Sequence, residues 1–180
     1  MEVKDENKVQ LYSAATANGI KVAAALEEIV EARKLKGEVP PFDYEPHTVR
    51  IRMSENLDQS FARMNPTCKI PVIRDFNGVD DEDGALTVFE SGAILLYLAE
   101  RYGDLISTAD MRLRYQTIEW LFWASSELSV QCKLFGFYYK YCAFSSYLSL
   151  LYYCMLLATR SRQPLTLFPV LTFLYLISCI

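Results

Sequence analysis

Histidine and regularly spaced cysteines are what this sequence of 180 residues most clearly lacks. It contains one histidine, His47, and five cysteines without a CxxC spacing. A structural zinc site needs several Cys or His ligands at short, recurring spacings, so the sequence predicts no metal site. The odd number of cysteines and the polar start MEVKDENKVQ favour reduced thiols in a cytoplasmic protein without a secretory signal.

An excess of positive charge is also absent. The chain carries 22 acidic and 18 basic side chains, for a net charge of −4. A nucleic-acid-binding protein would show a basic stripe, so this class of partner is excluded. Hydrophobic residues make up 52% of the sequence, which excludes a disordered chain. The length allows one ordinary domain or two small ones, with a core that needs no disulfides.

Charge is almost missing from the last part of the chain. Residues 142–180 contain no glycine, lysine or acidic residue, and their only charges are Arg160 and Arg162. The uncharged runs 142–159 and 163–180 approach the roughly 17–20 residues that span a bilayer, so membrane attachment through this tail is one interpretation. The abrupt change in composition favours another, that the tail is translated non-coding sequence or a wrongly joined gene.

Hydrophobic periodicity in the first hundred residues predicts the order β-α-β followed by β-β-α. We expect a four-stranded mixed sheet with helices on both faces, and then a helical region from Thr108 to about Phe135. Asn18 stands where the first helix would have its N-cap. The expected strands are 8–13, 42–51, 69–74 and 86–89, and the expected helices are 19–35 and 90–103.

Several separated motifs resemble, in their order and spacing, those of the glutathione transferases. The motifs are TANG, NPTCKIPV, FESGAILLYLAERYG, and WLFW with FGFYYKY. The likeness covers roughly residues 8–141 and is greatest to the bacterial nu-class (disulfide-bond oxidoreductase) and fungal nitrogen-regulator types. It implies an α/β thioredoxin-like domain at 1–105 and the start of an all-α domain at 106–141, and the apolar tail at 142–180 lies beyond the likeness. The helical domain of such a chain looks truncated.

The resemblance implies a glutathione-dependent transferase, to which the nu-class likeness adds glutathione-disulfide oxidoreductase activity. Glutathione would be the co-substrate, a small electrophile or a disulfide the second substrate, and a homodimer the expected assembly. Ala17 departs from the family, which usually has proline at this position. This departure and the shortened helical domain support an alternative, a non-catalytic glutathione-fold module or an inactive relative.

Thr16 and Asn18 match the two polar residues of the nu-class turn. A thiol with a pKa of about 8.5 is mostly protonated at neutral pH, whereas the thiolate is the attacking species. The Thr16 hydroxyl and the Asn18 amide, at the start of a helix, can donate hydrogen bonds that favour the thiolate. Tyr12 is the alternative donor, since tyrosine has this role in other classes, but its place inside a strand favours a core position.

The remaining predicted site residues would hold the glutathione peptide. Ser91 at a helix N-terminus suits the γ-glutamyl carboxylate and Glu90 the ammonium, although Ser91 could simply cap the helix. In the family Pro71 is cis, which would let the backbone of Ile70 pair with the cysteinyl part of glutathione. Asn56 and Lys69 would hold the glycyl end, with a solvated loop position as the alternative for each.

Four further features support no firm assignment. Cys68 lies close enough to the predicted thiol site for a mixed disulfide, but a bystander thiol is the simpler interpretation. The aromatic segment Phe135–Tyr141 would line the electrophile pocket or pack between helices. The acidic run NGVDDEDG lacks an EF-hand register, and the pair Glu45 and His47 has no nucleophile beside it.

Overall fold

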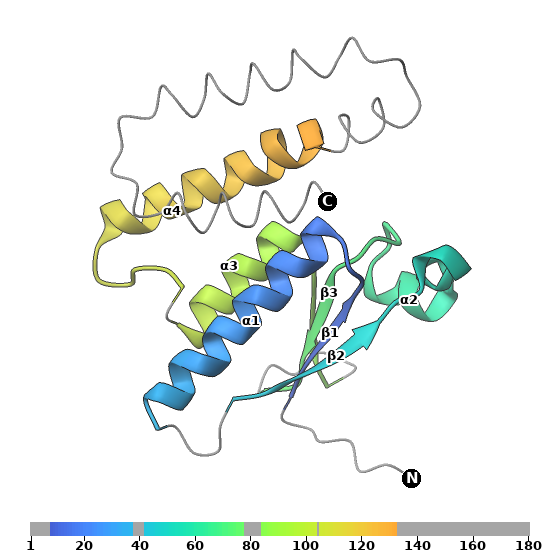
Figure 1. Ribbon diagram of the computed structural model, residues 1–180, viewed down its shortest axis with the longest axis horizontal. Coiled ribbons are helices and arrows are strands. Elements are labelled where there is room, and N and C mark those ends of the chain that lie inside the picture. The colour runs from blue at the N-terminus through green and yellow to red at the C-terminus, as the bar shows by residue number, and fades with distance from the viewer. Residues whose placement is uncertain (1–7, 38–41, 78–83, 104, 133–180) are drawn as a thin grey trace. The chain divides into compact units, whose positions relative to one another are not determined.

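The computed structural model of the protein describes residues 8–37, 42–77, 84–103 and 105–132 (Figure 1). The chain divides into two compact units, Met1–Ile118 and Glu119–Ile180. The predictions for residues 78–83 of the acidic loop, for the Phe135–Tyr141 aromatics and for the apolar tail lie outside the described residues.

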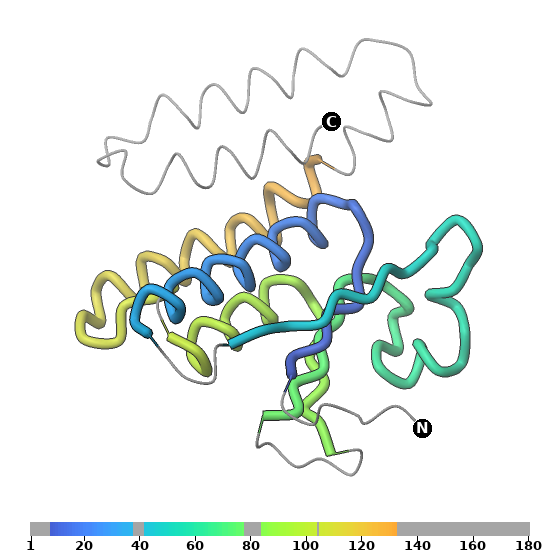
Figure 2. The backbone as a smooth tube through the Cα atoms, turned by 60° about the horizontal axis from the view of Figure 1, so that its bottom comes forward, coloured from blue at the N-terminus to red at the C-terminus, as the bar shows by residue number. Residues whose placement is uncertain are grey.

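A four-stranded mixed sheet is the centre of the first unit, and Figure 2 traces the course of the backbone through this unit. Its strands are β1 (Val9–Ser13), β2 (Tyr44–Thr48), β3 (Val72–Asp75) and β4 (Leu86–Phe89), in the spatial order β2-β1-β3-β4. β1 is parallel to β2 and antiparallel to β3, and β4 is antiparallel to β3. The predicted β-α-β, β-β-α order and the mixed sheet are confirmed, and together they make a thioredoxin-like α/β domain.

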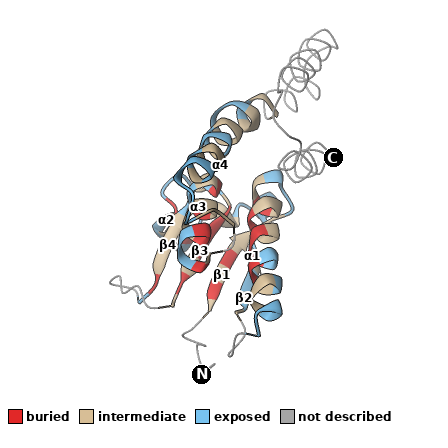
Figure 3. Cartoon of the chain, turned by 90° about the vertical axis from the view of Figure 1, so that its left-hand side faces the viewer, coloured by how far each residue is buried: buried red, intermediate tan, exposed pale blue. Residues whose placement is uncertain are grey.

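Helices cover both faces of this sheet, as predicted. α1 (Ala17–Leu35) and α3 (Ser91–Tyr102) pack together on one face, and α2 (Gln59–Met64) lies on the other (Figure 1). Figure 3 shows buried residues on β1, β3 and α1. Each fully buried leucine or isoleucine contributes about 1.5–3 kcal/mol to stability. The main core consists of Val9, Leu11, Val22, Ala25, Leu26, Ile29, Ile73, Ile94, Leu98 and Tyr102, and the smaller core under α2 consists of Val49, Phe61 and Val72.

The start of α1 differs from the prediction. Thr16, not Asn18, is the N-cap: its backbone is extended (φ −126°), and its Oγ1 accepts a hydrogen bond from the Gly19 N–H at 3.2 Å. Asn18 instead lies in the first turn of the helix. Gly19 packs so tightly against the end of β1 that a Cβ atom there would lie 2.3 Å from the Ala14 carbonyl oxygen. The first turn of α1 is therefore held close to the sheet.

Two strands are shorter than the periodicity predicts. β2 ends at Thr48 because the chain turns into the 3-10 helices η1 (Ile51–Met53) and η2 (Glu55–Leu57). The Arg50 N–H donates to Glu55 Oε2 at 2.7 Å, and this hydrogen bond lowers the pKa of Glu55. β3 begins at Val72 because Pro71 has no N–H for the ladder.

The helical region that follows begins later than predicted. α4 (Met111–Trp123) starts after Asp110, whose Oδ1 accepts hydrogen bonds from the N–H groups of Arg112 and Leu113 at 2.8 and 3.2 Å. A π-helical stretch, η3 (Ala124–Leu128), follows α4 directly. Within the part of the chain that the structure describes, no helix is long and apolar enough to cross a membrane.

A buried carboxylate ties α3 to the end of β3. Asp75 has no exposed surface, and it accepts hydrogen bonds from the Tyr97 hydroxyl at 2.6 Å and the Tyr102 hydroxyl at 2.5 Å. Its Oδ1 also accepts from the backbone and side-chain N–H groups of Asn77 at 2.8 and 2.9 Å. Burial and the hydrogen bond to Asp75 raise the pKa of both tyrosines well above 10. This buried charge is therefore fully provided with donors, as a charged group in a protein core requires.

Candidate functional site

Three loops meet at one end of the sheet. Tyr12 pairs with Val72 in the β1–β3 ladder, and Val72 pairs with Phe89 in the β3–β4 ladder. Beyond this row β1 leaves the sheet, β3 enters it and β4 leaves it, so the segments attached there must lie at the same edge. These segments carry most of the predicted site residues, namely Thr16, Asn18, Lys69, Ile70, Pro71, Glu90 and Ser91.

The first of these loops presents a helix start. The Thr16 Oγ1 is fixed by its capping bond from Gly19, and this bond uses a lone pair of the hydroxyl and not its hydrogen. Thr16 is exposed and Asn18 is partly exposed. The first N–H groups of a helix lack partners within the helix, and the helix dipole makes this end electropositive. The loop can therefore donate several hydrogen bonds to an anion.

Ala17, where the sequence departs from the family, is the first helical residue of α1. Proline is favoured at this position because its fixed φ suits the helix and its missing N–H costs no hydrogen bond there. The alanine keeps the Thr16 cap and the helix start. Its effect on catalytic geometry stays a prediction.

The second loop carries the predicted cis peptide bond, and the Ile70–Pro71 bond is indeed cis. Ile70 is partly exposed and lies just before β3. Among the described residues, no hydrogen bond uses its backbone N–H or C=O. A backbone position beside a strand, with both of its hydrogen-bonding groups unpaired among the described residues, is a suitable place for the backbone of a peptide ligand.

The third loop changes into a helix at Ser91. Glu90 occupies the cap position, is exposed, and has a φ of +66°, an unusual value for a residue other than glycine. Ser91 is the first residue of α3 and is 7% exposed, so the interpretation of Ser91 as the N-cap is wrong. Its hydroxyl and the free first-turn N–H groups lie together at the electropositive end of this helix.

A hydrogen bond connects the Asn56 side chain to the second loop. Its Nδ2 donates to the Cys68 carbonyl oxygen at 2.9 Å, and its Oδ1 is buried without a partner among the described residues. The side chain is partly buried, whereas a solvated loop asparagine was the alternative interpretation. Lys69, one residue further along from Cys68, is exposed.

Asn65 was missed by reasoning from the sequence. It is 1% exposed; its Nδ2 donates to the Lys69 carbonyl oxygen at 2.7 Å, and its Oδ1 accepts from both the N–H and the hydroxyl of Thr67 at 2.9 Å. The pair Asn65-Pro66 is a turn signal that could have drawn attention to this residue.

Cys68 is a partly buried free thiol with a φ of +54°. Its N–H donates to the Asn65 carbonyl oxygen at 2.9 Å, which closes the turn before Lys69. The mixed-disulfide and bystander interpretations of this thiol both stay predictions.

Tyr12 packs as the sequence predicted, in the smaller core under α2. Its hydroxyl donates to Gln10 Oε1 at 2.9 Å, two residues back along β1 and away from the three loops. Burial raises its pKa. These contacts give Tyr12 no role in activating a thiol.

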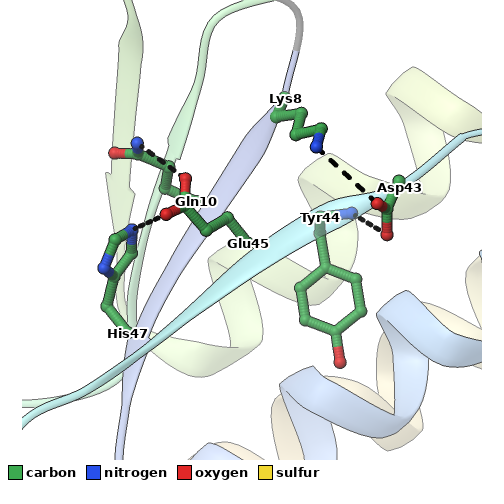
Figure 4. Close-up of polar contacts among 6 residues, drawn as sticks. All are labelled: Lys8, Gln10, Asp43, Tyr44, Glu45 and His47. Atoms are coloured by element: carbon green, nitrogen blue, oxygen red, sulfur yellow. Dashed lines mark hydrogen bonds and ion pairs between the residues drawn. The ribbon is translucent and has the colours of Figure 1, made fainter. Parts of the chain in front are cut away.

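His47, on β2, lies opposite Tyr12 of the neighbouring strand β1. The rings of Tyr12 and His47 stack with centroids 4.6 Å apart. His47 Nε2 lies 3.6 Å from Glu45 Oε1 (Figure 4). Glu45 Oε2 in turn accepts from Gln10 Nε2 at 3.4 Å. No nucleophile takes part in this cluster. Among the described residues, no group of three or more His, Cys, Asp or Glu side chains could hold a metal ion.

Comparison with known proteins matches a region that contains the second and third loops, but not Thr16 and Asn18 of the first loop. Residues 32–101 match the family described as glutathione S-transferase, N-terminal domain. The chain is 35% identical over 136 residues to the disulfide-bond oxidoreductase YghU of Escherichia coli (strain K12), an alignment that covers 76% of this chain and 44% of that protein. It spans about half the length of the curated relatives it matches.

Solved structures give the same result. A glutathione transferase from Pseudomonas putida, with one glutathione disulfide bound per subunit, is 38% identical with a TM-score of 0.64, covering 78% of this chain and 55% of that one. The nitrogen regulation fragment of the yeast prion protein Ure2p has a TM-score of 0.62 at 23% identity, covering 81% of this chain and 61% of that one, which shows a shared fold alone.

Proposed function

Because the chain belongs to the glutathione S-transferase family through its N-terminal domain, we propose that it binds glutathione and activates its thiol, as a glutathione-dependent transferase or disulfide oxidoreductase. One observation carries the proposal: three loops at one end of the sheet each offer unpaired hydrogen-bonding groups. These groups would bind the cysteinyl backbone, the γ-glutamyl end, the glycyl end and the thiol of the tripeptide. The Pseudomonas relative solved with glutathione disulfide and the Escherichia coli relative named as an oxidoreductase support the same assignment.

The peptide part of glutathione would pair with Ile70. Both backbone groups of this residue are unpaired among the described residues, and Pro71 prevents the strand from starting earlier. A pair of backbone hydrogen bonds at this position would align the cysteinyl residue of glutathione along the edge of the loop.

The γ-glutamyl end would bind at the start of α3. Its carboxylate would accept hydrogen bonds from Ser91 and from first-turn N–H groups, and its ammonium would pair with the exposed Glu90 carboxylate. At the other end, the glycyl carboxylate would be held by the exposed Lys69 and by the second amide hydrogen of Asn56.

The thiol would lie at the start of α1. The hydroxyl hydrogen of Thr16 and the side-chain amide of Asn18 would donate to the sulfur, and the helix dipole adds to their effect. These donors favour the thiolate, which then attacks an electrophile or a disulfide sulfur. The proposal also includes a small electrophile or a disulfide as the second substrate, and a homodimer as the assembly. It divides the chain into the ranges 1–105, 106–141 and 142–180.

Calorimetric titration of the full chain with reduced glutathione and with glutathione disulfide tests the proposal. The wild type should bind, and Ser91→Ala should lose about tenfold or more in affinity, because a hydrogen bond to a charged group is worth about 1.5–3 kcal/mol. Ser126→Ala is the matched control, since Ser126 is exposed and its hydroxyl bonds only the Phe122 carbonyl of its own helix. Unchanged affinity in Ser91→Ala would remove Ser91 from the site.

A turnover assay then separates an enzyme from a non-catalytic glutathione-binding module. Glutathione-dependent turnover by the wild type, lost in Asn18→Ala while binding persists, is the result expected of an enzyme. Binding without any turnover would favour the non-catalytic module. A folded wild-type chain that binds neither form of glutathione would overturn the proposed function as a whole.

A further inference from the structure

We propose that Asn65 is a positioning residue for glutathione binding: its buried side-chain amide orients the peptide unit that carries the Ile70 N–H. The inference rests on the proposed function. It assigns a role in that function to a residue that is itself buried and presents no surface to a ligand.

Every polar group of Asn65 is used to hold the second loop. Its backbone N–H donates to the Phe61 carbonyl oxygen in α2, and its backbone carbonyl accepts from the Cys68 N–H, both at 2.9 Å. Its side-chain oxygen accepts from the N–H and the hydroxyl of Thr67, and its Nδ2 donates to the Lys69 carbonyl oxygen at 2.7 Å. One residue thus connects the end of α2 with each step of the turn that leads to Ile70.

The bond to the Lys69 carbonyl matters most, because this carbonyl and the Ile70 N–H belong to one peptide unit. A peptide unit is planar, and in its trans form the C=O and the N–H point in opposite directions. When Asn65 holds the Lys69 oxygen toward the protein, the Ile70 N–H is turned away from Asn65. The direction of the Ile70 N–H, the donor that would meet glutathione, is therefore set by a side chain at the opposite edge of the same peptide unit.

A second amide supports the preceding peptide unit. Asn56 Nδ2, from η2, donates to the Cys68 carbonyl oxygen at 2.9 Å. Two asparagine amides from different elements thus hold two consecutive carbonyls, directly before the residue whose own backbone groups are unpaired. Cys68 meanwhile has a φ of +54°, a conformation that residues with a side chain adopt rarely and keep only when their surroundings enforce it.

The chemistry explains why an asparagine is needed at position 65. The site requires one acceptor for Thr67 and one donor for the Lys69 oxygen on the same short, planar group. An aspartate has nearly the same shape and keeps the acceptor, but when ionised it has no donor. While its carboxyl group is ionised, Asn65→Asp therefore lacks the donor to the Lys69 oxygen, and it places a negative oxygen next to the carbonyl that was held.

The test uses the full chain and three proteins, the wild type, Asn65→Asp and Thr67→Ala. Thr67→Ala is the matched control, because it removes the hydroxyl bond to the same amide and leaves the bond to Lys69 in place. Calorimetry with reduced glutathione should give a loss of about tenfold or more for Asn65→Asp and of less than about threefold for Thr67→Ala.

Amide NMR spectra add a readout that a general loss of stability would not produce. On adding glutathione to the wild type, the amide signals of Ile70, Ser91 and Gly92 should shift. In Asn65→Asp the Ile70 shift should be lost while Ser91 and Gly92 still respond. A folded Asn65→Asp variant with an affinity within about twofold of the wild type, or with an unchanged Ile70 response, would overturn the inference.

A measurement on the wild type alone covers the case in which Asn65→Asp does not fold. The side-chain amide protons of Asn65 should exchange with solvent much more slowly than those of a free amide, both without and with glutathione. Exchange as fast as in a free amide would overturn the inference. Failure of the proposed function is distinct from this result, because it appears as an absence of glutathione binding by the folded wild type.

Discussion

The polar groups at the two ends of strand β3 differ in whether they have hydrogen-bond partners. Behind one end, the Asp75 carboxylate is fully buried and accepts four hydrogen bonds, from Tyr97, Tyr102 and Asn77. Just before the other end, Ile70 has both backbone groups unpaired among the described residues, and Cys68 has a positive φ. Glu90, which follows the neighbouring strand β4 at the same edge of the sheet, also has a positive φ. Satisfied polar groups hold the fold together at the first end, whereas unsatisfied groups and uncommon backbone conformations are typical of sites that bind ligands.

The difference predicts where changes affect stability and where they affect binding. At the Asp75 end, loss of the carboxylate leaves the partly buried Tyr97 hydroxyl and the buried Tyr102 hydroxyl without this acceptor. At the Ile70 end the groups that meet a ligand contribute little to the folded state by themselves, while the buried amides behind them hold the geometry.

The largest expected effect on stability is that of Asp75→Ala. It leaves the Tyr97 and Tyr102 hydroxyls without their acceptor inside the protein, which should cost about 3 kcal/mol or more of unfolding free energy. Denaturant unfolding followed by circular dichroism measures this. Asp58→Ala, an exposed aspartate without a side-chain capping bond, should stay within about 0.5 kcal/mol of the wild type. A loss below about 1 kcal/mol in Asp75→Ala would contradict the role given to this carboxylate.

Alkaline pH should weaken the hydrogen bonds that tyrosine hydroxyls donate to carboxylates, from Tyr97 and Tyr102 to Asp75 and from Tyr44 to Glu27, without mutation. Burial, followed by the hydrogen bond to Glu27, raises the pKa of Tyr44 to about 12 from its ordinary value of 10, and burial and Asp75 raise those of Tyr97 and Tyr102. A group whose pKa is raised on folding stabilises the protein below its unfolded pKa, and this contribution is lost as the pH rises toward its folded pKa.

We therefore expect the unfolding midpoint to fall from pH 10 upward, the range above the ordinary tyrosine pKa of 10. Tyr44→Phe should remove part of this fall, between pH 10 and about 12, since it removes the Tyr44 hydroxyl that donates to Glu27 Oε1 at 2.6 Å. Denaturant titrations of wild type and variant at a series of pH values measure the difference. Parallel profiles for the two proteins would contradict this account of Tyr44.

The smallest expected effect is a gain in stability, and it concerns the first loop at the Ile70 end of the sheet. Ala17 is the first residue of α1, and Thr16 before it already has the extended backbone (φ −126°, ψ 158°) that a following proline requires. Ala17→Pro should therefore stabilise the protein by about 0.4–1 kcal/mol, measured as a higher unfolding midpoint. Ala24→Pro, in the middle of the same helix, should cost about 3 kcal/mol or more. A loss of stability in Ala17→Pro would show that the loop needs the Ala17 N–H.

Local patterns in the sequence predicted the elements well. Val22, Ala25, Leu26, Ile29 and Val30 recur at the three- and four-residue spacing of a helix face; the first four are buried and Val30 is partly buried. β4 has the predicted bounds. The cis bond before Pro71 followed from the family resemblance and is present. The N-cap of α1 was assigned to Asn18 and belongs to Thr16, because both residues have the right side chain and only the backbone conformation distinguishes them.

The amino-acid sequence by itself determined which segments become strands and helices, since the spacing of apolar residues depends only on local geometry. It also determined the sites of the turns, through residues such as Pro66 and Gly103. Only the tertiary structure decided which polar groups find partners. Asp75 meets Tyr97 across 22 positions and Asn56 meets Cys68 across 12, and no local pattern encodes such pairs. Packing brings these groups together, and among the described residues it leaves the backbone groups of Ile70 without partners, because a hydrogen bond depends on distance and direction in space.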